Sequence, residues 1–298
     1  MFRLLPPVTR GCAFFVLVFF NTFFWALPLY AIAILKLLLP TPWWRRVSER
    51  TLMGIAQLWV GDNNAILDLT QRIEWVVEGA EELERETWYI VSSNHQSWAD
   101  VLVLQRVFHR RIPFLKFFIK RQLIWVPLLG LAWWALDLPF MHRHSKEYLA
   151  RHPERIGEDL KTTRDACRRF TKTPTTILNF LEGTRFSPEK KARQQSPYRH
   201  LLKPKAGGIA LVVDAMGDRL RSLLDVSVVY VGRSARFWDF ASGRVSRVVV
   251  RVREIEIPEE FRHGDYQDDP LFRQRVQDWV AELWAVKDQW IEETGAGV

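Results

Sequence analysis

Apolar and polar positions follow two different patterns along this chain. Near the N-terminus, apolar residues run almost unbroken from Gly11 to Leu39, interrupted only by Asn21, Thr22, Pro28 and Lys36. This run exceeds the ~20 residues that a membrane-spanning helix needs. Beyond it, short apolar runs alternate with segments in which apolar residues recur every three or four positions. The first pattern predicts a membrane segment and the second a folded domain.

The N-terminal run is predicted to be a retained membrane anchor over residues 1–45, followed by a second domain over residues 46–298. A signal peptide would have an apolar core of only ~7–15 residues and a cleavage site, and neither is present. Two arrangements remain open: a hairpin broken near Asn21 to Pro28, and a single span. Positive flanks favour the cytoplasmic side, so we expect an inner-membrane protein whose second domain faces the cytoplasm. These flanking arginines are Arg3, Arg10, Arg45, Arg46 and Arg50.

The second domain is predicted to be α/β, because strand-like and helix-like segments alternate. Helical spacing is clear in residues 154–170 and again in residues 272–290, where apolar residues fall on one face. The predicted strands are residues 72–79, 87–94, 112–119, 135–141, 175–183, 225–232 and 244–257.

Two segments depart from this alternation. Residues 186–200 are polar, basic and contain two prolines, which predicts a mobile loop. Residues 123–136 carry no charge, yet fourteen residues are too few for a comfortable membrane span. We expect a buried helix there, with a lipid-facing segment as the alternative.

Composition adds a preference for anionic partners. The net charge is +8, which suits nucleic acid, a phospholipid surface or a phosphorylated substrate, and charge alone does not choose among them. The apolar N-terminus favours phospholipid, so we expect the bilayer as a partner and no nucleic acid. Cys12 and Cys167 lie in unlike surroundings, which predicts free thiols in a reducing compartment. The seven histidines do not cluster with carboxylates at ligand spacing, so no metal site is expected.

The segment from Asn94 to Asp100 is the first candidate for chemistry. It follows a predicted buried strand and precedes a predicted helix, which places His95 where open α/β sheets put their sites. Asp100 would accept the proton on one ring nitrogen of His95 and leave the other to take a proton from a hydroxyl. The competing interpretation is that Asp100 only caps the helix.

The second candidate is the turn Glu182-Gly183-Thr184-Arg185, which closes another predicted strand. Glycine permits a tight turn, and the following residues offer amides, a hydroxyl and a guanidinium. The planar guanidinium of arginine suits phosphate or carboxylate.

Together, these motifs resemble those of the glycerolphosphate and lysophosphatidate acyltransferase family over residues 75 to 232. Between them, the segment from Lys120 to Gly130 is similar to the family's Lys-x-Glu-Leu-x3-Pro-x2-Gly block, and residues 137–143 resemble its second motif. Gln122, Asp137 and Leu181 stand where the family usually has Glu, Gly and Pro. The resemblance implies a mixed central sheet flanked by helices.

The resemblance also implies transfer of a fatty acyl group from acyl-CoA or acyl-ACP to a lysophospholipid hydroxyl, with no cofactor. His95 and Asp100 would be catalytic, and backbone amides near Gly130 would stabilise the oxyanion. Residues implied to bind the acceptor are Lys120, Arg143, Glu182, Gly183, Thr184, Arg185 and Lys205.

The acceptor's identity remains open at this point. 1-Acyl-sn-glycerol-3-phosphate would give phosphatidic acid, whereas lysophosphatidylglycerol and lysocardiolipin are alternatives within the same family. Two other classes compete: a thioesterase using the same histidine on water, and a membrane scaffold that binds anionic lipid without catalysis.

Overall fold

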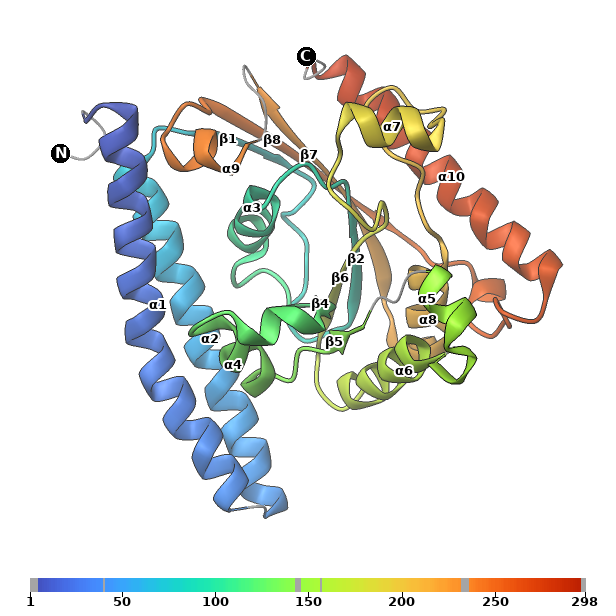
Figure 1. The fold of residues 1–298 in the computed structure, drawn as a ribbon, viewed down its shortest axis with the longest axis horizontal. Helices are drawn as coiled ribbons and strands as arrows, with labels where there is room; N and C mark the ends of the chain where they lie inside the picture. Colours follow the sequence, from blue (N-terminus) through green and yellow to red (C-terminus); the bar gives the residue numbers. More distant parts are fainter. Residues whose placement is uncertain (1–4, 40, 143–145, 156, 232–235, 296–298) are drawn as a thin grey trace.

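The computed structural model contains a six-stranded sheet (Figure 1) and describes residues 5–39, 41–142, 146–155, 157–231 and 236–295. Its strand order is β1-β8-β7-β2-β6-β3. β7, β2, β6 and β3 are parallel, whereas β8 runs antiparallel to β7 and parallel to β1. The predicted mixed sheet is therefore confirmed. The strands are β1 (Glu74–Glu78), β2 (Tyr89–Ser93), β3 (Leu115–Phe117), β6 (Thr176–Phe180), β7 (Ser222–Val231) and β8 (Arg247–Ile255).

Helices cover both faces of this sheet. One face packs against α6 (Glu158–Phe170), α8 (Gly207–Met216) and α10 (Pro270–Glu293), and the other against α3 (Ala99–Phe108) and α9 (Phe237–Ala241). Alternate residues of β2 enter the two cores, with Ile90 on one side and Tyr89 and Val91 on the other, as strand geometry requires. The helix predicted at residues 272–290 is confirmed by α10, and the helix predicted at residues 154–170 is confirmed from Glu158 to Phe170 as α6.

The N-terminal region forms two long helices that lie side by side, α1 (Pro7–Leu38) and α2 (Pro42–Thr70) (Figure 1). α1 continues through Pro28, so the hairpin alternative, with a break near Asn21 to Pro28, is contradicted. The polar side chain of Asn21 does not end the helix, because it donates a hydrogen bond to Asn63 Oδ1 of α2 at 2.9 Å. Among the described helices, α1 alone is long and apolar enough to cross a membrane. The predicted domain boundary at residue 45 falls inside α2.

Four local predictions are wrong. The predicted strand 112–119 divides into β3 and β4 (Ile119–Lys120), and only the last two residues of 135–141 form a strand, β5 (Phe140–Met141), which pairs with β4. Residues 123–136 lie in η2 (Arg121–Trp125) and α4 (Leu129–Ala135), both partly exposed, instead of one buried helix. The predicted loop 186–200 contains α7 (Pro188–Gln194), because the Ser187 hydroxyl accepts a hydrogen bond from the Lys190 backbone N–H.

The remaining elements are short and connect the layers. They are α5 (Lys146–Arg151), η3 (Pro153–Arg155), η4 (Gly217–Arg219) and η5 (Glu259–Phe261). Both cysteines are free, as predicted; Cys12 is exposed and Cys167 is buried. Burial raises the pKa of the Cys167 thiol to about 12, so this side chain is a core residue and not a nucleophile.

Candidate active site

The two sequence motifs meet at one edge of the sheet. β2 and β6 are parallel neighbours, so the loop after Ser93 and the turn after Phe180 leave the sheet at the same edge. The backbone joins them directly, because the Phe186 N–H donates to the His95 carbonyl oxygen at 2.7 Å. This arrangement brings the His95 backbone N–H within hydrogen-bonding distance of the Glu182 carboxylate, although the two residues are 87 positions apart in the sequence.

His95 and Asp100 form a hydrogen-bonded pair. The distance from His95 Nδ1 to Asp100 Oδ2 is 2.8 Å, and the histidine side chain is 16% exposed while the aspartate is fully buried. A carboxylate accepts hydrogen bonds, so Nδ1 carries the proton and Nε2 keeps its lone pair. The ring also stacks on Phe180, with centroids 3.9 Å apart, which fixes its plane. The pair therefore has the geometry of an oriented general base.

Asp100 also organises the loop that carries the histidine. Its Oδ2 accepts hydrogen bonds from the backbone N–H groups of Gln96 at 2.6 Å and Ser97 at 2.9 Å, and its Oδ1 accepts from the Tyr230 hydroxyl at 2.6 Å. The competing interpretation, that Asp100 only caps the helix, is wrong, because Asp100 lies in the first turn of α3 and its backbone donors precede that helix. The same carboxylate holds the loop and binds the ring.

Asn94 fixes this loop to a third strand. Its side-chain amide donates to the Val228 carbonyl at 2.9 Å and accepts from the Val228 N–H at 2.8 Å. The residue is fully buried between β2 and β7. Sequence reasoning noted Asn94 as part of the motif without giving it a role, because its partner lies 134 residues away.

Glu182 lies beneath the histidine loop. It is fully buried, and its two oxygens accept from the backbone N–H groups of His95 at 3.0 Å and Leu202 at 3.3 Å. Burial raises the pKa of this carboxyl group to about 8, although both N–H donors act to lower it. These contacts position two loops. The expected contact of Glu182 with the acceptor finds no support in them and stays a prediction.

The rest of the second motif faces solvent beside the histidine loop. Gly183 has a φ of +67°, which favours glycine. The exposed Arg185 places its guanidinium over the indole of Trp98, 5.2 Å from the ring centroid. Lys190 of α7 donates to the Thr184 hydroxyl and to the Arg185 carbonyl, both at 2.8 Å. The turn is thus held from one side by α7 and from the other by Trp98.

The other predicted cations divide into two groups. Lys205 belongs to the site, because its Nζ lies 3.2 Å from the position that a Cβ on Gly183 would occupy. Lys120 is exposed on β4 in the separate small sheet and forms no ion pair with the described residues. Arg143 lies outside the described residues. The predicted amide near Gly130 is not free, since the Gly130 N–H donates to the Val126 carbonyl at 2.9 Å.

Sequence reasoning missed Tyr230, Phe180 and Lys190. Tyr230 lies in a predicted strand, so its burial could be predicted. The partner of its hydroxyl, Asp100, depends on the order of the strands in the sheet. A group of three exposed side chains brings atoms that could bind a metal within 4.8 Å of one another; the residues are Asp218, Glu259 and His263. Their spacing in the sequence did not indicate a metal site.

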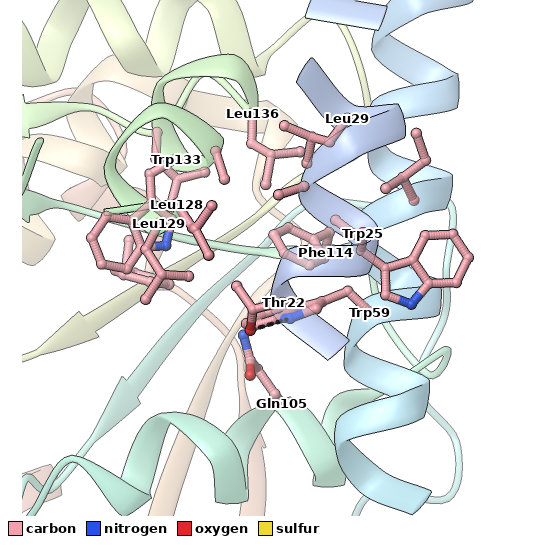
Figure 2. A pocket seen from close by; sticks show the side chains of 16 residues that line it. Thr22, Trp25, Leu29, Trp59, Gln105, Phe114, Leu128, Leu129, Trp133 and Leu136 are labelled. Atoms are coloured by element: carbon pink, nitrogen blue, oxygen red, sulfur yellow. Dashed lines mark hydrogen bonds between the residues drawn. The ribbon is translucent and has the colours of Figure 1, made fainter. Parts of the chain in front are cut away.

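An apolar cavity of about 40 Å³ lies between the helix pair and the sheet domain (Figure 2). Its walls come from α1, α2, α3 and the segment around α4, and its polar contacts include the hydrogen bond between Trp59 Nε1 and the Thr22 hydroxyl. Gln105 reaches it from α3, the helix that also carries Asp100. His95 does not line this cavity.

Comparison with known proteins gives consistent similarities. A family model described as Acyltransferase matches residues 74–231, a segment that contains the site from His95 to Lys205. The chain is 21% identical over 217 residues to the mouse (Mus musculus) 1-acyl-sn-glycerol-3-phosphate acyltransferase epsilon, covering 68% of this chain and 57% of the relative. It is 23% identical over 180 residues to the human (Homo sapiens) gamma enzyme, covering 57% and 43%. The chain spans about half the length of these curated relatives.

A solved structure shares the fold. The crystal structure of the 1-acyl-sn-glycerophosphate (LPA) acyltransferase PlsC from Thermotoga maritima superimposes with a TM-score of 0.53 and 17% sequence identity. The match covers 94% of this chain and 98% of that one, so it includes the helix pair as well as most of the sheet domain.

Proposed function

Because the chain belongs to the acyltransferase family, we propose that it moves a fatty acyl group from acyl-CoA or acyl-ACP to the hydroxyl of a lysophospholipid. We propose 1-acyl-sn-glycerol-3-phosphate as the acceptor and phosphatidic acid as the product, in keeping with the names of the similar enzymes. The observation that carries the proposal is the His95–Asp100 pair at 2.8 Å, one strand away from the turn that bears Arg185.

The chemistry follows from the orientation of His95. Its Nε2 takes the proton of the acceptor hydroxyl while the oxygen attacks the thioester carbonyl carbon, and Asp100 stabilises the imidazolium that forms. When the tetrahedral intermediate collapses, the carbon–sulfur bond breaks and the thiolate leaves with the proton from Nε2. No covalent acyl-enzyme is needed, because the acceptor supplies the nucleophile.

Arginine and lysine side chains around the turn are suited to hold the acceptor phosphate. Arg185 and Lys205 are exposed beside the histidine loop, and a guanidinium binds phosphate through two parallel hydrogen bonds. Lys120 and Arg143 keep their predicted roles as further phosphate ligands through the family resemblance. Gly183 and Thr184 shape the turn that presents Arg185.

Membrane attachment would bring enzyme and lipid together. α1 is long and apolar enough for a bilayer, and most of its surface is exposed on the protein. We propose that this attachment is at the inner membrane and that the catalytic domain faces the cytoplasm. The acyl donors would reach His95 from that side.

Product analysis by mass spectrometry tests the proposal. Purified full-length protein in lipid vesicles is given a labelled acyl-CoA or acyl-ACP together with 1-acyl-sn-glycerol-3-phosphate, lysophosphatidylglycerol or lysocardiolipin. We expect labelled phosphatidic acid as the main product. Free labelled fatty acid would instead identify a hydrolase, and the absence of thiol release with every acceptor would indicate a lipid-binding scaffold.

A further inference from the structure

A short segment between β4 and β5, the two strands of the small sheet, displays large apolar side chains to solvent. In η2 and α4, Trp125 is 85% exposed, Leu131 57% and Trp134 45%. Leu131 and Trp134 are three residues apart and therefore lie on one face of α4. No charged residue occurs from Leu123 to Leu136. Exposed apolar groups gathered in this way mark an interaction surface more often than an ordinary surface of a soluble domain.

The segment is held rigidly in this position. Leu128, just before α4, has a φ of 64°, a conformation that costs free energy for a residue other than glycine. Gly130 packs so closely on η2 that a Cβ there would lie 1.9 Å from the Ile124 carbonyl oxygen. Such strain persists only where the surrounding structure fixes it. The apolar side chains are thus presented by a fixed turn.

This surface continues onto α1. The Tyr30 hydroxyl of α1 donates to the Leu128 carbonyl oxygen, and the Lys36 ammonium of α1 pairs with Asp137 at 3.0 Å. Tyr30 is flanked along the helix surface by Leu27 and Ile34, which are 57% and 56% exposed. The exposed apolar stripe of α1 therefore reaches the segment that carries Trp125, Leu131 and Trp134.

The chemistry around the segment selects a lipid partner. Its start is basic, with Lys120 and Arg121 both exposed, and Arg45 and Arg46 are exposed near the α1–α2 connection. Tryptophans next to basic residues are typical of the boundary between lipid tails and headgroups. We propose that η2 and α4 form a second membrane-contact element, which inserts Trp125, Leu131 and Trp134 into the leaflet that holds α1. This inference rests on the proposed membrane attachment of the enzyme.

The element would set the height of the catalytic domain above the lipid. With Trp125 in the leaflet, Lys120 and Arg121 lie at the level of the headgroups, where the phosphate of a lysophospholipid is found. Lys120 could then meet the acceptor before it reaches His95, although it lies on the separate small sheet.

Site-directed fluorescence tests this element in the full chain. In a Cys12→Ser background, which removes the exposed native thiol, single cysteines replace Trp125, Trp134, Phe24 on the α1 stripe and Leu271 at the start of α10. Leu271 is a matched control, because it is an apolar residue that is 77% exposed but belongs to α10, which lies on the opposite side of the sheet domain from α1 (Figure 1). Each variant carries an environment-sensitive dye and is reconstituted into phosphatidylglycerol-containing vesicles with doxyl-labelled lipids as quenchers.

We expect quenching at positions 125, 134 and 24 and none at 271. Quenching at 24 without quenching at 125 and 134 would overturn the inference and leave membrane attachment by α1 in place. Absence of quenching at 24, 125 and 134 would overturn both. Equal quenching at 271 would show nonspecific contact and also overturn the inference.

A kinetic comparison separates membrane contact from a structural role. The double variant Trp125→Ser/Trp134→Ser should transfer acyl groups about tenfold more slowly to an acceptor embedded in vesicles, since two apolar anchors are lost. Its rate on an acceptor dispersed in detergent should match that of the wild type. An equal loss in both media would contradict the inference, because it would show damage to the fold.

Discussion

Asp100 and Asp225 are both buried carboxylates of the sheet domain, but their partners are of opposite kinds. Asp100 accepts from two backbone N–H groups, from the Tyr230 hydroxyl and from the His95 ring. Asp225, on β7, pairs with Lys287 of α10 at 2.8 Å and with Arg253 of β8 at 2.6 Å. Lys287 is fully buried, and burial lowers the pKa of its ammonium group while Asp225 acts to raise it.

The difference separates a structural carboxylate from a chemical one. Asp225 is paired with a lysine of α10 and an arginine of β8, so this aspartate joins α10 to the sheet. Among the described residues, the hydrogen-bond partners of Asp100 include no lysine and no arginine. Its balancing charge would arise when His95 takes a proton, which is the moment at which catalysis needs stabilisation.

The largest expected effect is on Asp100. Replacing it with asparagine, which keeps shape but removes the charge, should lower the turnover by up to about 10⁴-fold, since His95 loses both its tautomer control and the stabilisation of the imidazolium. The midpoint of thermal unfolding in detergent should change little, because asparagine still bonds the loop. Acyl transfer within tenfold of wild type would contradict the role of Asp100.

The matched substitution Asp225→Asn should have the reverse profile. It leaves Lys287 buried without its main counter-charge, which costs about 3–5 kcal/mol of unfolding free energy. Activity per folded molecule should stay at the wild-type level, because Asp225 does not contact His95. Denaturant unfolding gives the free energy of unfolding, and the rate of acyl transfer is divided by the concentration of folded protein. A variant with intact stability and lost turnover would remove the distinction between the two aspartates.

A third buried carboxylate, Glu182, predicts a pH dependence of stability. Its pKa is raised from 4.5 to about 8 by burial. Between these values the folded protein keeps a proton that the unfolded chain releases, so this group's contribution to stability is present below pH 4.5 and is lost as the pH rises to about 8. Through this group, the free energy of unfolding changes by at most about 1.4 kcal/mol per pH unit.

Comparison with Glu182→Gln isolates this contribution. The difference in unfolding free energy between wild type and variant should favour the wild type more strongly at pH 5 than at pH 8. A difference that grows with pH would mean that the folded protein prefers the ionised carboxylate, held by the N–H groups of His95 and Leu202.

The smallest expected effect is that of Tyr230→Phe. The variant loses one hydrogen bond to Asp100, worth about 1 kcal/mol, and the turnover should fall about fivefold. The KM for the acceptor should stay constant, because Tyr230 is buried and its hydroxyl donates to Asp100. Steady-state kinetics separates the two parameters. A rise in KM with unchanged turnover would argue against a positioning role.

Local pattern predicted much of this architecture. The strands that became β1, β2, β6, β7 and β8 are apolar runs bounded by polar or turn residues, and two parallel neighbours bring the motifs together at one edge. The pairing of His95 with Asp100 follows from five-residue spacing across the start of a helix. The strands and the His95–Asp100 pair depend on residues close in sequence, so both can be predicted without a structure, whereas the meeting of the two motifs depends on the pairing of β2 with β6.

The remainder depends on contacts between distant residues. Asn21 and Pro28 left a break in α1 open as one of two alternatives, but α2 supplies a partner for Asn21 and the helix continues. Glu182 is buried and accepts hydrogen bonds from the N–H groups of His95 and Leu202. The sequence of its motif does not show this burial. The exposed segment around Trp125 read as a buried helix because an apolar run looks the same whether protein or lipid covers it.

Transfer by His95→Ala is the most direct test of the central claim that this histidine deprotonates the acceptor. Wild type and variant are purified as full chains, reconstituted in the same vesicles and assayed with one acyl donor and 1-acyl-sn-glycerol-3-phosphate. Unfolding temperature and vesicle binding serve as controls and should be unchanged. The account predicts a loss of phosphatidic acid formation of about 10⁴-fold. Wild-type turnover by the folded, membrane-bound variant would contradict it.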